Sequence, residues 1–174
     1  MKHERAPQFT IELMRPEDVA EATEMRLQSW LDTYPNDSHG VSREWIEAHN
    51  EGQRSDEKHR LRLERFALPN TKGWVARDLG GKIIGATNPY TDDNGVQHVG
   101  SLYVDKDFHG RGVGSALMKK VVEYFNSTKP IELSVASYND RAQAFYRKWG
   151  FEEIPDSESM FADMIPEIKM LRKG

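Results

Sequence analysis

Residues 98–118 read HVGSLYVDKDFHGRGVGSALM, and they set the fold that we expect for the rest of the chain. The first part has the β-branched and aromatic residues of a buried strand, which should end near Val104. Three glycines at alternate positions then lead into SALMKKVVEYF, whose apolar residues recur at helical spacing. Glycines let backbone N–H groups converge on a ligand, and the first turn of a helix adds unpaired donors and a positive dipole end. The stretch therefore predicts an anion site, with phosphate as the anion.

Two familiar phosphate-binding motifs do not fit the spacing of these glycines. A P-loop needs a lysine and then serine or threonine after its last glycine, whereas Gly114 is followed by Ser115 and Ala116. A dinucleotide-binding fingerprint needs its first glycine directly at the end of the strand. Here the segment 105–109 separates the strand from Gly110. The glycines therefore predict a different kind of phosphate ligand.

A second motif lies downstream of the glycines. Residues 131–136, IELSVA, are typical of another buried strand. The segment that follows has an apolar helical stripe, and Gly150 ends this helix before a further extended run. The two segments together resemble the GCN5-related N-acetyltransferase (GNAT) family. The acyl-CoA loop of that family, Gln/Arg-x-x-Gly-x-Gly/Ala, is matched by His109, Gly112 and Gly114, with histidine in the first place. The second half, Asn-x-x-Ala-x-x-x-Tyr-x-x-x-Gly-Phe, is matched in full by Asn139, Ala142, Tyr146, Gly150 and Phe151.

The resemblance implies a mixed α/β fold in which a largely antiparallel central sheet is flanked by helices. The length of the chain predicts a single domain over residues 1–174. It also implies an acetyl-CoA-dependent N-acetyltransferase that moves an acetyl group to a primary amine by direct attack in a ternary complex. The alternative is an acyl-CoA-binding sensor or regulatory module without turnover. Acetyl-CoA is the expected co-substrate, and by resemblance it contacts Leu102, Tyr103, Val104, His109, Gly110, Arg111, Gly112, Val113, Gly114, Ser115, Asn139 and Ala142.

Two residues are candidates for proton transfer. The resemblance puts Tyr146 beside the thioester sulfur, and a phenol with a pKa near ~10 suits a donor to the departing thiolate. The alternative for Tyr146 is a core aromatic in an amphipathic helix. Many relatives carry a glutamate in the strand before the glycine loop, where this chain has His98 and Gly100. A histidine side chain can exchange a proton near neutral pH, so His98 could take the amine proton through water, or it could be a surface histidine beside a turn.

The first residue of the glycine loop departs from the family pattern. Relatives often direct the side chain at the position of His109 toward the pyrophosphate. A protonated imidazole could act in the same way, or Arg111 could take over this role. Asn139 could hold the pantetheine arm, cap the following helix, or do both.

The acceptor pocket is expected at two turns. In the resembled family the link between the first two helices usually borders this pocket, and here it carries Tyr34, Asn36 and Asp37. Asp93 lies in the turn before the strand that leads to the glycines. With 24 basic and 28 acidic residues the net charge is −4, so we expect an acidic mouth that draws a cationic amine. The alternative for both segments is a solvated turn.

The amino-acid composition argues against several other classes of function and of partner. The net charge of −4 offers no electrostatic footprint for nucleic acid or an anionic membrane, so the expected partner is a small-molecule or peptide amine acceptor. A homodimer is the assembly left open beside the monomer. No cysteine is present, which excludes disulfides and thiolate metal sites, and the histidines lack metal-ligand spacing, so no metal is expected. The N-terminus, MKHERAPQF, lacks the apolar region of a signal peptide, and no apolar run approaches membrane length, so a cytoplasmic protein is expected.

The hydrophobic pattern of the rest of the sequence predicts further helices and strands before and after residues 98–118. Turn formers and paired glycines separate segments of alternating or helical hydrophobicity. In chain order, we expect a strand over residues 9–14, a helix to about Thr33, one helix or two over 42–66, a hairpin turning at 80–81, a turn over 88–95 and a last strand over 164–171.

Overall fold

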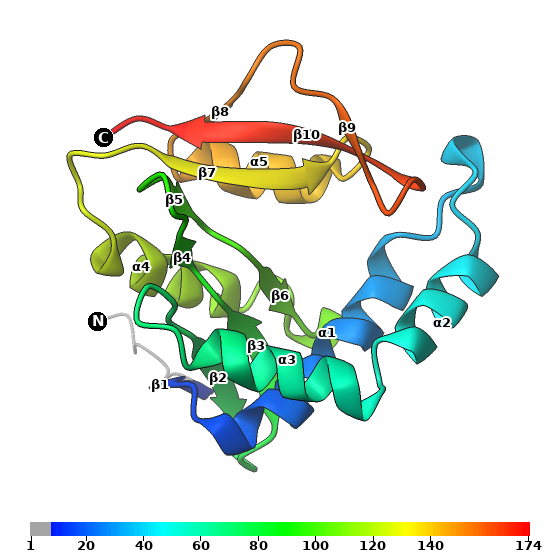
Figure 1. The fold of residues 1–174 in the computed structure, drawn as a ribbon, viewed down its shortest axis with the longest axis horizontal. Helices are drawn as coiled ribbons and strands as arrows, with labels where there is room; N and C mark the ends of the chain where they lie inside the picture. Colours follow the sequence, from blue (N-terminus) through cyan, green and yellow to red (C-terminus); the bar gives the residue numbers. More distant parts are fainter. Residues whose placement is uncertain (1–7) are drawn as a thin grey trace, which may run out of the picture.

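The computed structural model describes residues 8–174 (Figure 1). The expectation that the N-terminus carries no signal peptide concerns mainly residues 1–7, which lie outside the described residues. No helix within residues 8–174 combines the length and apolar composition needed to cross a bilayer. The elements are β1 (Phe9–Leu13), η1 (Pro16–Asp18), α1 (Val19–Thr33), η2 (Asp37–His39), α2 (Arg43–Gly52), α3 (Asp56–Phe66), β2 (Trp74–Asp78), β3 (Ile83–Thr87), β4 (Tyr90–Thr91), β5 (Gln97–His98), β6 (Leu102–Val104), η3 (Lys106–Phe108), α4 (Val113–Tyr124), β7 (Ile131–Ala136), α5 (Asp140–Lys148), β8 (Phe151–Glu153), β9 (Ser159–Phe161) and β10 (Ile165–Arg172).

The strands form two sheets. The first has the order β1-β2-β3-β6, and the second has the order β4-β5-β7-β10-β8, with β9 paired to β10. Every pairing is antiparallel except that of β5 with β7. The expected mixed, largely antiparallel α/β fold is therefore confirmed.

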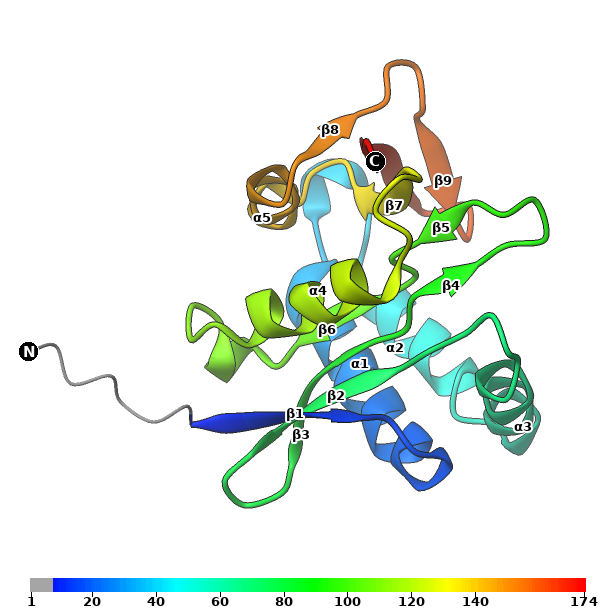
Figure 2. The same cartoon turned by 90° about the vertical axis from the view of Figure 1, so that its left-hand side faces the viewer.

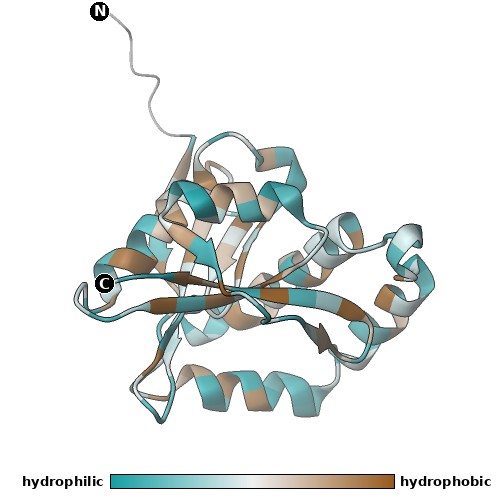
Figure 3. Ribbon diagram, turned by 90° about the horizontal axis from the view of Figure 1, so that it is seen from above, coloured by the Kyte–Doolittle hydropathy of each residue, from teal (hydrophilic) through white to brown (hydrophobic). Residues whose placement is uncertain are grey.

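Successive side chains of β2 and β3 point to opposite faces of the first sheet, and a different helix covers each face. Val75 and Ile83 are buried against α1, whereas their neighbours Ala76 and Ile84 are buried against α4. Since side chains alternate across a strand, α1 and α4 must lie on opposite faces, as Figure 2 shows. Helix α5 packs on the second sheet through Tyr146. The helices show mixed bands of polar and apolar residues in Figure 3, as expected when one side faces a sheet.

The segment between residues 42 and 66 forms two helices because each has its own N-cap. The Ser42 hydroxyl oxygen accepts a hydrogen bond from the Trp45 N–H at 3.1 Å, and that of Ser55 accepts one from the Lys58 N–H at 3.3 Å. Such caps satisfy backbone donors that have no partner within the helix. The first helix of the chain ends at Thr33, as expected from the sequence.

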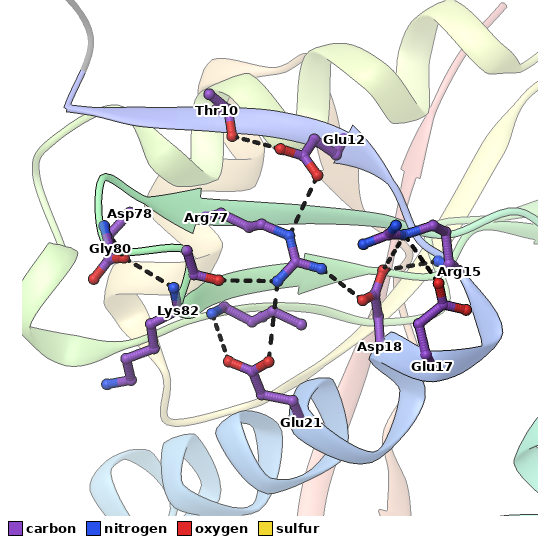
Figure 4. A network of polar contacts seen from close by, with 12 residues as sticks. Thr10, Glu12, Arg15, Glu17, Asp18, Glu21, Arg77, Asp78, Gly80 and Lys82 are labelled. Atoms are coloured by element: carbon purple, nitrogen blue, oxygen red, sulfur yellow. Dashed lines mark hydrogen bonds and ion pairs between the residues drawn. The ribbon is translucent and has the colours of Figure 1, made fainter.

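An ion-pair network fixes the start of α1 against β2 (Figure 4). The Arg77 guanidinium donates to Asp18 and to Glu12, and Asp18 is 5% exposed. Burial opposes ionisation of Asp18, but the Arg15 N–H and the Arg77 guanidinium together hold the pKa of that carboxyl below its ordinary value. This network positions the helix whose other end reaches the candidate site.

The strand expected from residue 98 to Val104 is two strands in different sheets. β5 pairs with β4 and β7, whereas β6 pairs with β3. The turn expected over residues 88–95 contains a short strand, β4, which supplies a partner for β5. Between β5 and β6, Gly100 has φ +72°, and a Cβ atom there would lie 2.1 Å from the Asn88 carbonyl oxygen. The chain therefore crosses another backbone segment so closely that only glycine fits, and β6 leaves the second sheet at this point.

Replacement of Gly100 by alanine should destabilise the fold strongly. Gly40→Ala is a matched control, because Gly40 has φ +68° and no atom lies within 4 Å of the position that its Cβ would take. Positive φ alone should cost about 1 kcal/mol in the control, whereas the backbone clash should bring the loss for Gly100→Ala to about 3 kcal/mol or more. Urea denaturation of both variants measures the difference, and equal losses would contradict the role given to the contact with Asn88.

Candidate active site

A cleft of about 590 Å³ lies where β6 and β7 diverge. Its walls come from β6 and the glycine loop on one side, and from β7 and α5 on the other. The structure brings most of the expected cofactor residues into this lining, namely Leu102, Tyr103, Val104, His109, Gly110, Gly112, Gly114, Ser115, Asn139 and Ala142.

Two expected residues do not line the cleft. The Val113 side chain is buried in the core with Ile84 and Leu117, and Arg111 stacks on Phe108 with its Cζ 5.2 Å from the ring centroid. A side-chain contribution from Arg111 in place of His109 therefore has no support in the cleft lining. The backbone N–H of Val113 remains a free helix-start donor, since the first turn of a helix has no internal acceptors for its N–H groups.

The glycine loop has the backbone geometry that a phosphate group needs. Gly110 and Gly112 have φ +74° and +87°, and Gly112 is the N-cap of α4. At Gly114 a Cβ atom would lie 3.7 Å from Phe145 and from Val104, which is ordinary van der Waals contact, so a larger side chain there would meet α5 and β6. Donors at the start of α4 and the positive end of its dipole thus lie beside the cleft.

The imidazole of His109 is neutral and forms hydrogen bonds to the protein on both of its nitrogens. Its Nε2 lies 2.9 Å from the Val104 carbonyl oxygen, and its Nδ1 faces the guanidinium of Arg141. Because a guanidinium can only donate, Nδ1 accepts and the Nε2–H donates. Burial and the charge of Arg141 lower the pKa of His109. This geometry therefore gives no support to a protonated imidazole directed at pyrophosphate.

The cations of the cleft come from α5. Among the described residues that line the cleft, Arg141 and Lys148 are cationic and none is a carboxylate. Sequence analysis missed Arg141, although its position two residues after Asn139 in the first turn of α5 was a usable signal. The Asn139 side chain accepts from the Ala142 N–H at 3.1 Å, which confirms Asn139 as a helix cap.

Three tyrosines, Tyr34, Tyr103 and Tyr146, line the cleft, and a fourth, Tyr138, supports Tyr34 from behind the lining. Tyr146 is 8% exposed and lines the cleft, and burial together with nearby Tyr103 raises its pKa. The hydroxyl groups of Tyr34 and Tyr103 lie 3.2 Å apart. The Tyr138 hydroxyl donates to the Tyr34 carbonyl oxygen at 2.7 Å and so holds the end of α1 in place.

A second cavity of about 500 Å³, the side cavity, meets the cleft at this point. Helices α1 and α3 and the strands β9 and β10 supply much of its lining. The residues common to the two linings are Tyr34, Gly100, Ser101, Tyr103 and Ser134. Tyr34 is thus where an acceptor-pocket residue was expected, and two ligands could meet at this shared wall.

Two of the expected acceptor residues lie outside both linings. Asn36 forms a β-bridge with Val41, and its side chain contacts the His39 imidazole at 3.1 Å. Asp37 is exposed at the start of η2. This segment is a solvated turn, because its polar side chains satisfy each other and the local backbone.

Asp93 and His98 also lie outside both linings. Asp93 is exposed in a turn that Asp92 closes by accepting from the N–H groups of Asn94 and Val96. The His98 Nε2 lies 3.1 Å from Asp92 Oδ2, and its ring stacks on Tyr90. The linings therefore give no support to an acidic mouth, and the alternative of a solvated turn describes Asp93. His98 is positioned by the β4–β5 pairing, as the alternative of a histidine beside a turn also implies.

The charged side chains that line the side cavity are mostly positive, whereas the sequence predicted an acidic acceptor pocket. Arg26, Arg62 and Arg65 line it, and Glu167 on β10 is the one carboxylate in the lining. Burial raises the pKa of Glu167. No group of three or more His, Asp or Glu residues among residues 8–174 is arranged to hold a metal ion.

Comparison with known proteins agrees with this geometry. Residues 24–151 match the acetyltransferase (GNAT) family. An uncharacterized N-acetyltransferase from Methanocaldococcus jannaschii is 42% identical over 60 residues, which are 33% of this chain and 26% of that protein. An N-acetylaspartate synthetase from Danio rerio is 30% identical over 89 residues, which are 49% of this chain and 31% of that protein. The matched segments are thus a minor part of both relatives.

Among solved structures, PaiA N-acetyltransferase from Thermoplasma acidophilum, in complex with coenzyme A, has a TM-score of 0.73. It is 20% identical to this chain, and the alignment covers 95% of this chain and 99% of that one. Such a likeness shows the fold. The family match spans most of the sequence, so this chain belongs to the acetyltransferase (GNAT) family, and the resemblance carried by the two motifs is confirmed.

Proposed function

We propose that this protein is an N-acetyltransferase that moves an acetyl group from acetyl-CoA to a primary amine, with both substrates bound at once. The observation that carries this proposal is the meeting of two cavities at one wall, with Tyr34 and Tyr103 in both linings. One cavity has the loop and cations for a phosphorylated thioester, and the other leaves room for the acceptor. The Danio rerio relative is named as an N-acetylaspartate synthetase, which makes an amino acid one candidate for the amine.

The cleft fits acetyl-CoA by its donors and its charge. Backbone N–H groups at the start of α4, with Arg141 and Lys148, would bind the phosphate groups. The unpaired edge of β6 offers backbone groups to the pantetheine amides. When bound, acetyl-CoA supplies an activated acetyl group as a thioester.

Direct attack forms a C–N bond and breaks the C–S bond, so one proton must leave the amine and one must reach the sulfur. The hydroxyl of Tyr146 donates the proton to sulfur, because burial keeps this phenol protonated at neutral pH. Glu167 accepts the proton from the amine, directly or through water, in place of His98. Its raised pKa lies closer to neutrality, which suits a general base, and it lines the side cavity. Proton return from Glu167 to Tyr146 through solvent restores both groups.

Release of free thiol from acetyl-CoA in the presence of an amine panel tests this function directly. The panel should contain amino acids, polyamines and a peptide with a free N-terminus. Thiol release that requires an amine supports the enzyme. Binding of acetyl-CoA with no turnover for any amine would instead support a sensor module.

Replacement of Gly112 by valine should weaken acetyl-CoA binding by about tenfold or more, because a β-branched residue tolerates φ +87° poorly and the loop donors would shift. Gly81→Val is the matched control, since Gly81 has φ +86°, equally open space and a place in the β2–β3 turn. Calorimetric titration with acetyl-CoA compares the two folded variants. Equal affinities would contradict the role of the loop.

The variant Tyr146→Phe keeps the ring and removes the hydroxyl. Turnover should fall by roughly 10²-fold, the usual share of general-acid catalysis, while affinity for acetyl-CoA stays near that of the wild type. Tyr124→Phe, on α4 and outside the cleft lining, controls for loss of a tyrosine hydroxyl elsewhere. Wild-type turnover in Tyr146→Phe would show that another group protonates the sulfur.

The rate at low pH should report on Glu167. A base must be deprotonated, so kcat/KM for the amine should rise with pH through the pKa of Glu167, which burial places above 4.5. Glu167→Gln should lower kcat by about 10²-fold and remove this acid limb, whereas any limb due to the amine itself should remain. Glu158→Gln, an exposed residue before β9, is the control. An unchanged acid limb in Glu167→Gln would exclude Glu167 as the base.

A further inference from the structure

The side cavity is lined by three arginines that pair with no described carboxylate, a feature they share with Arg111, Arg141, Arg147 and Arg172 elsewhere in residues 8–174. Arg26 comes from α1, and Arg62 and Arg65 come from α3. Within residues 8–174, no Asp or Glu oxygen lies within ion-pair distance of these three guanidinium groups. The arginines that do pair with carboxylates are Arg15, Arg43, Arg54, Arg60 and Arg77.

Two of the three arginines have contacts that hold them in place without neutralising them. Arg62 is half-buried, and its Nη2 donates to the Gln53 carbonyl oxygen at 2.9 Å and to Gln53 Oε1 at 2.8 Å. Arg65 lies over Tyr90, with its Cζ 5.0 Å from the ring centroid. These contacts orient the guanidinium groups but supply no negative charge, so the groups keep their capacity to bind an anion.

The positive charge of Arg26 lowers the pKa of other groups in the side cavity. Burial lowers the pKa of Arg62, and the charge of Arg26 lowers it further. Burial and Arg26 also lower the pKa of His49, which lines the same cavity and stacks on Trp30. Like charges brought together in a partly buried site are unfavourable, and an entering anion relieves that repulsion.

We propose that the acceptor is an amine that also carries carboxylate groups, as an acidic amino acid does, and that Arg26, Arg62 and Arg65 bind those carboxylates. The proposal rests on the proposed function. Helix α3 lines the side cavity and not the cleft, whereas Tyr34 and Tyr103 line both. An acceptor with its carboxylates at α3 therefore presents its amine toward the shared wall, where the thioester would lie.

The same arrangement selects against other acceptors. A polyamine would meet three like charges with Glu167 as the one opposing group in the lining. An uncharged analogue of the same size would leave the guanidinium groups without a partner. The planar guanidinium group donates two parallel hydrogen bonds to a carboxylate. The arginines would therefore favour an acceptor by both the charge and the geometry of its carboxylate groups.

The test compares acceptors that differ in charge but little in size. Thiol release from acetyl-CoA is measured with aspartate, glutamate, asparagine, glutamine and spermidine. We expect kcat/KM for aspartate or glutamate to exceed that for its amide by at least about tenfold, with little turnover of spermidine, and the preference should weaken as salt rises. A preference for the amides or for spermidine overturns the proposal while leaving the acetyltransferase function intact.

Glutamine variants test whether the arginines that line the side cavity, rather than any arginine of α3, bind the acceptor. Arg26→Gln, Arg62→Gln and Arg65→Gln should each lower kcat/KM for the acidic acceptor by about 10- to 100-fold and leave KM for acetyl-CoA unchanged. Arg60→Gln is the control, because Arg60 lies on the same helix and pairs with Glu64 outside the cavity. Arg65 is exposed, so its variant should fold even if a substitution at half-buried Arg26 or Arg62 does not.

If no amine gives thiol release, the proposed function fails and the arginine site is still tested by binding. Calorimetric titration with aspartate and with glutamate, in the presence of coenzyme A, should show binding that Arg62→Gln weakens and Arg60→Gln does not. Absence of binding to the wild-type protein, or equal binding to both variants, overturns the proposal.

Discussion

The close approach of Gly100 to the Asn88 carbonyl oxygen separates β6 from β7, and the rest of the site depends on that separation. A strand that stayed in one sheet would close the cleft, leaving no opening beside the glycine loop. Once the strands diverge, the cleft and the side cavity can share a wall. Gly100 itself belongs to that wall, so one backbone crossing both opens the cleft and brings the two linings together.

The distribution of charge, rather than its sum, determines what the cavities can bind. The chain carries a net charge of −4, yet the lining of the cleft holds cations alone and the lining of the side cavity holds three arginines and one carboxylate. Most of the acidic side chains are exposed, and many of them form ion pairs such as Arg54 with Glu24. Exposed pairs of this kind are screened and contribute little, whereas unpaired charges in a cavity act strongly on a ligand.

The sequence predicted the cleft well because its motifs are contiguous. The loop from His109 to Ser115 and the cap at Asn139 each depend on neighbours within a few residues, so spacing alone was informative. The side cavity was not predictable, since residues from α1, α3 and β10 meet only in the folded chain. The two alternatives for His98 stayed open in the sequence for a related reason, because the direction of its side chain depends on pairing with β4, a strand too short to leave a clear pattern.

The two cavities are built from largely separate parts of the chain. Residues 102–148 supply most of the cleft, whereas α1, α3 and the β9–β10 hairpin supply much of the side cavity. Substitutions at sites that share no contacts usually act independently. If the arginines bind the acceptor as proposed, changes at Arg62 or Arg65 would alter the choice of amine without altering the glycine loop. Such a division would let acceptor specificity change separately from the binding of the thioester.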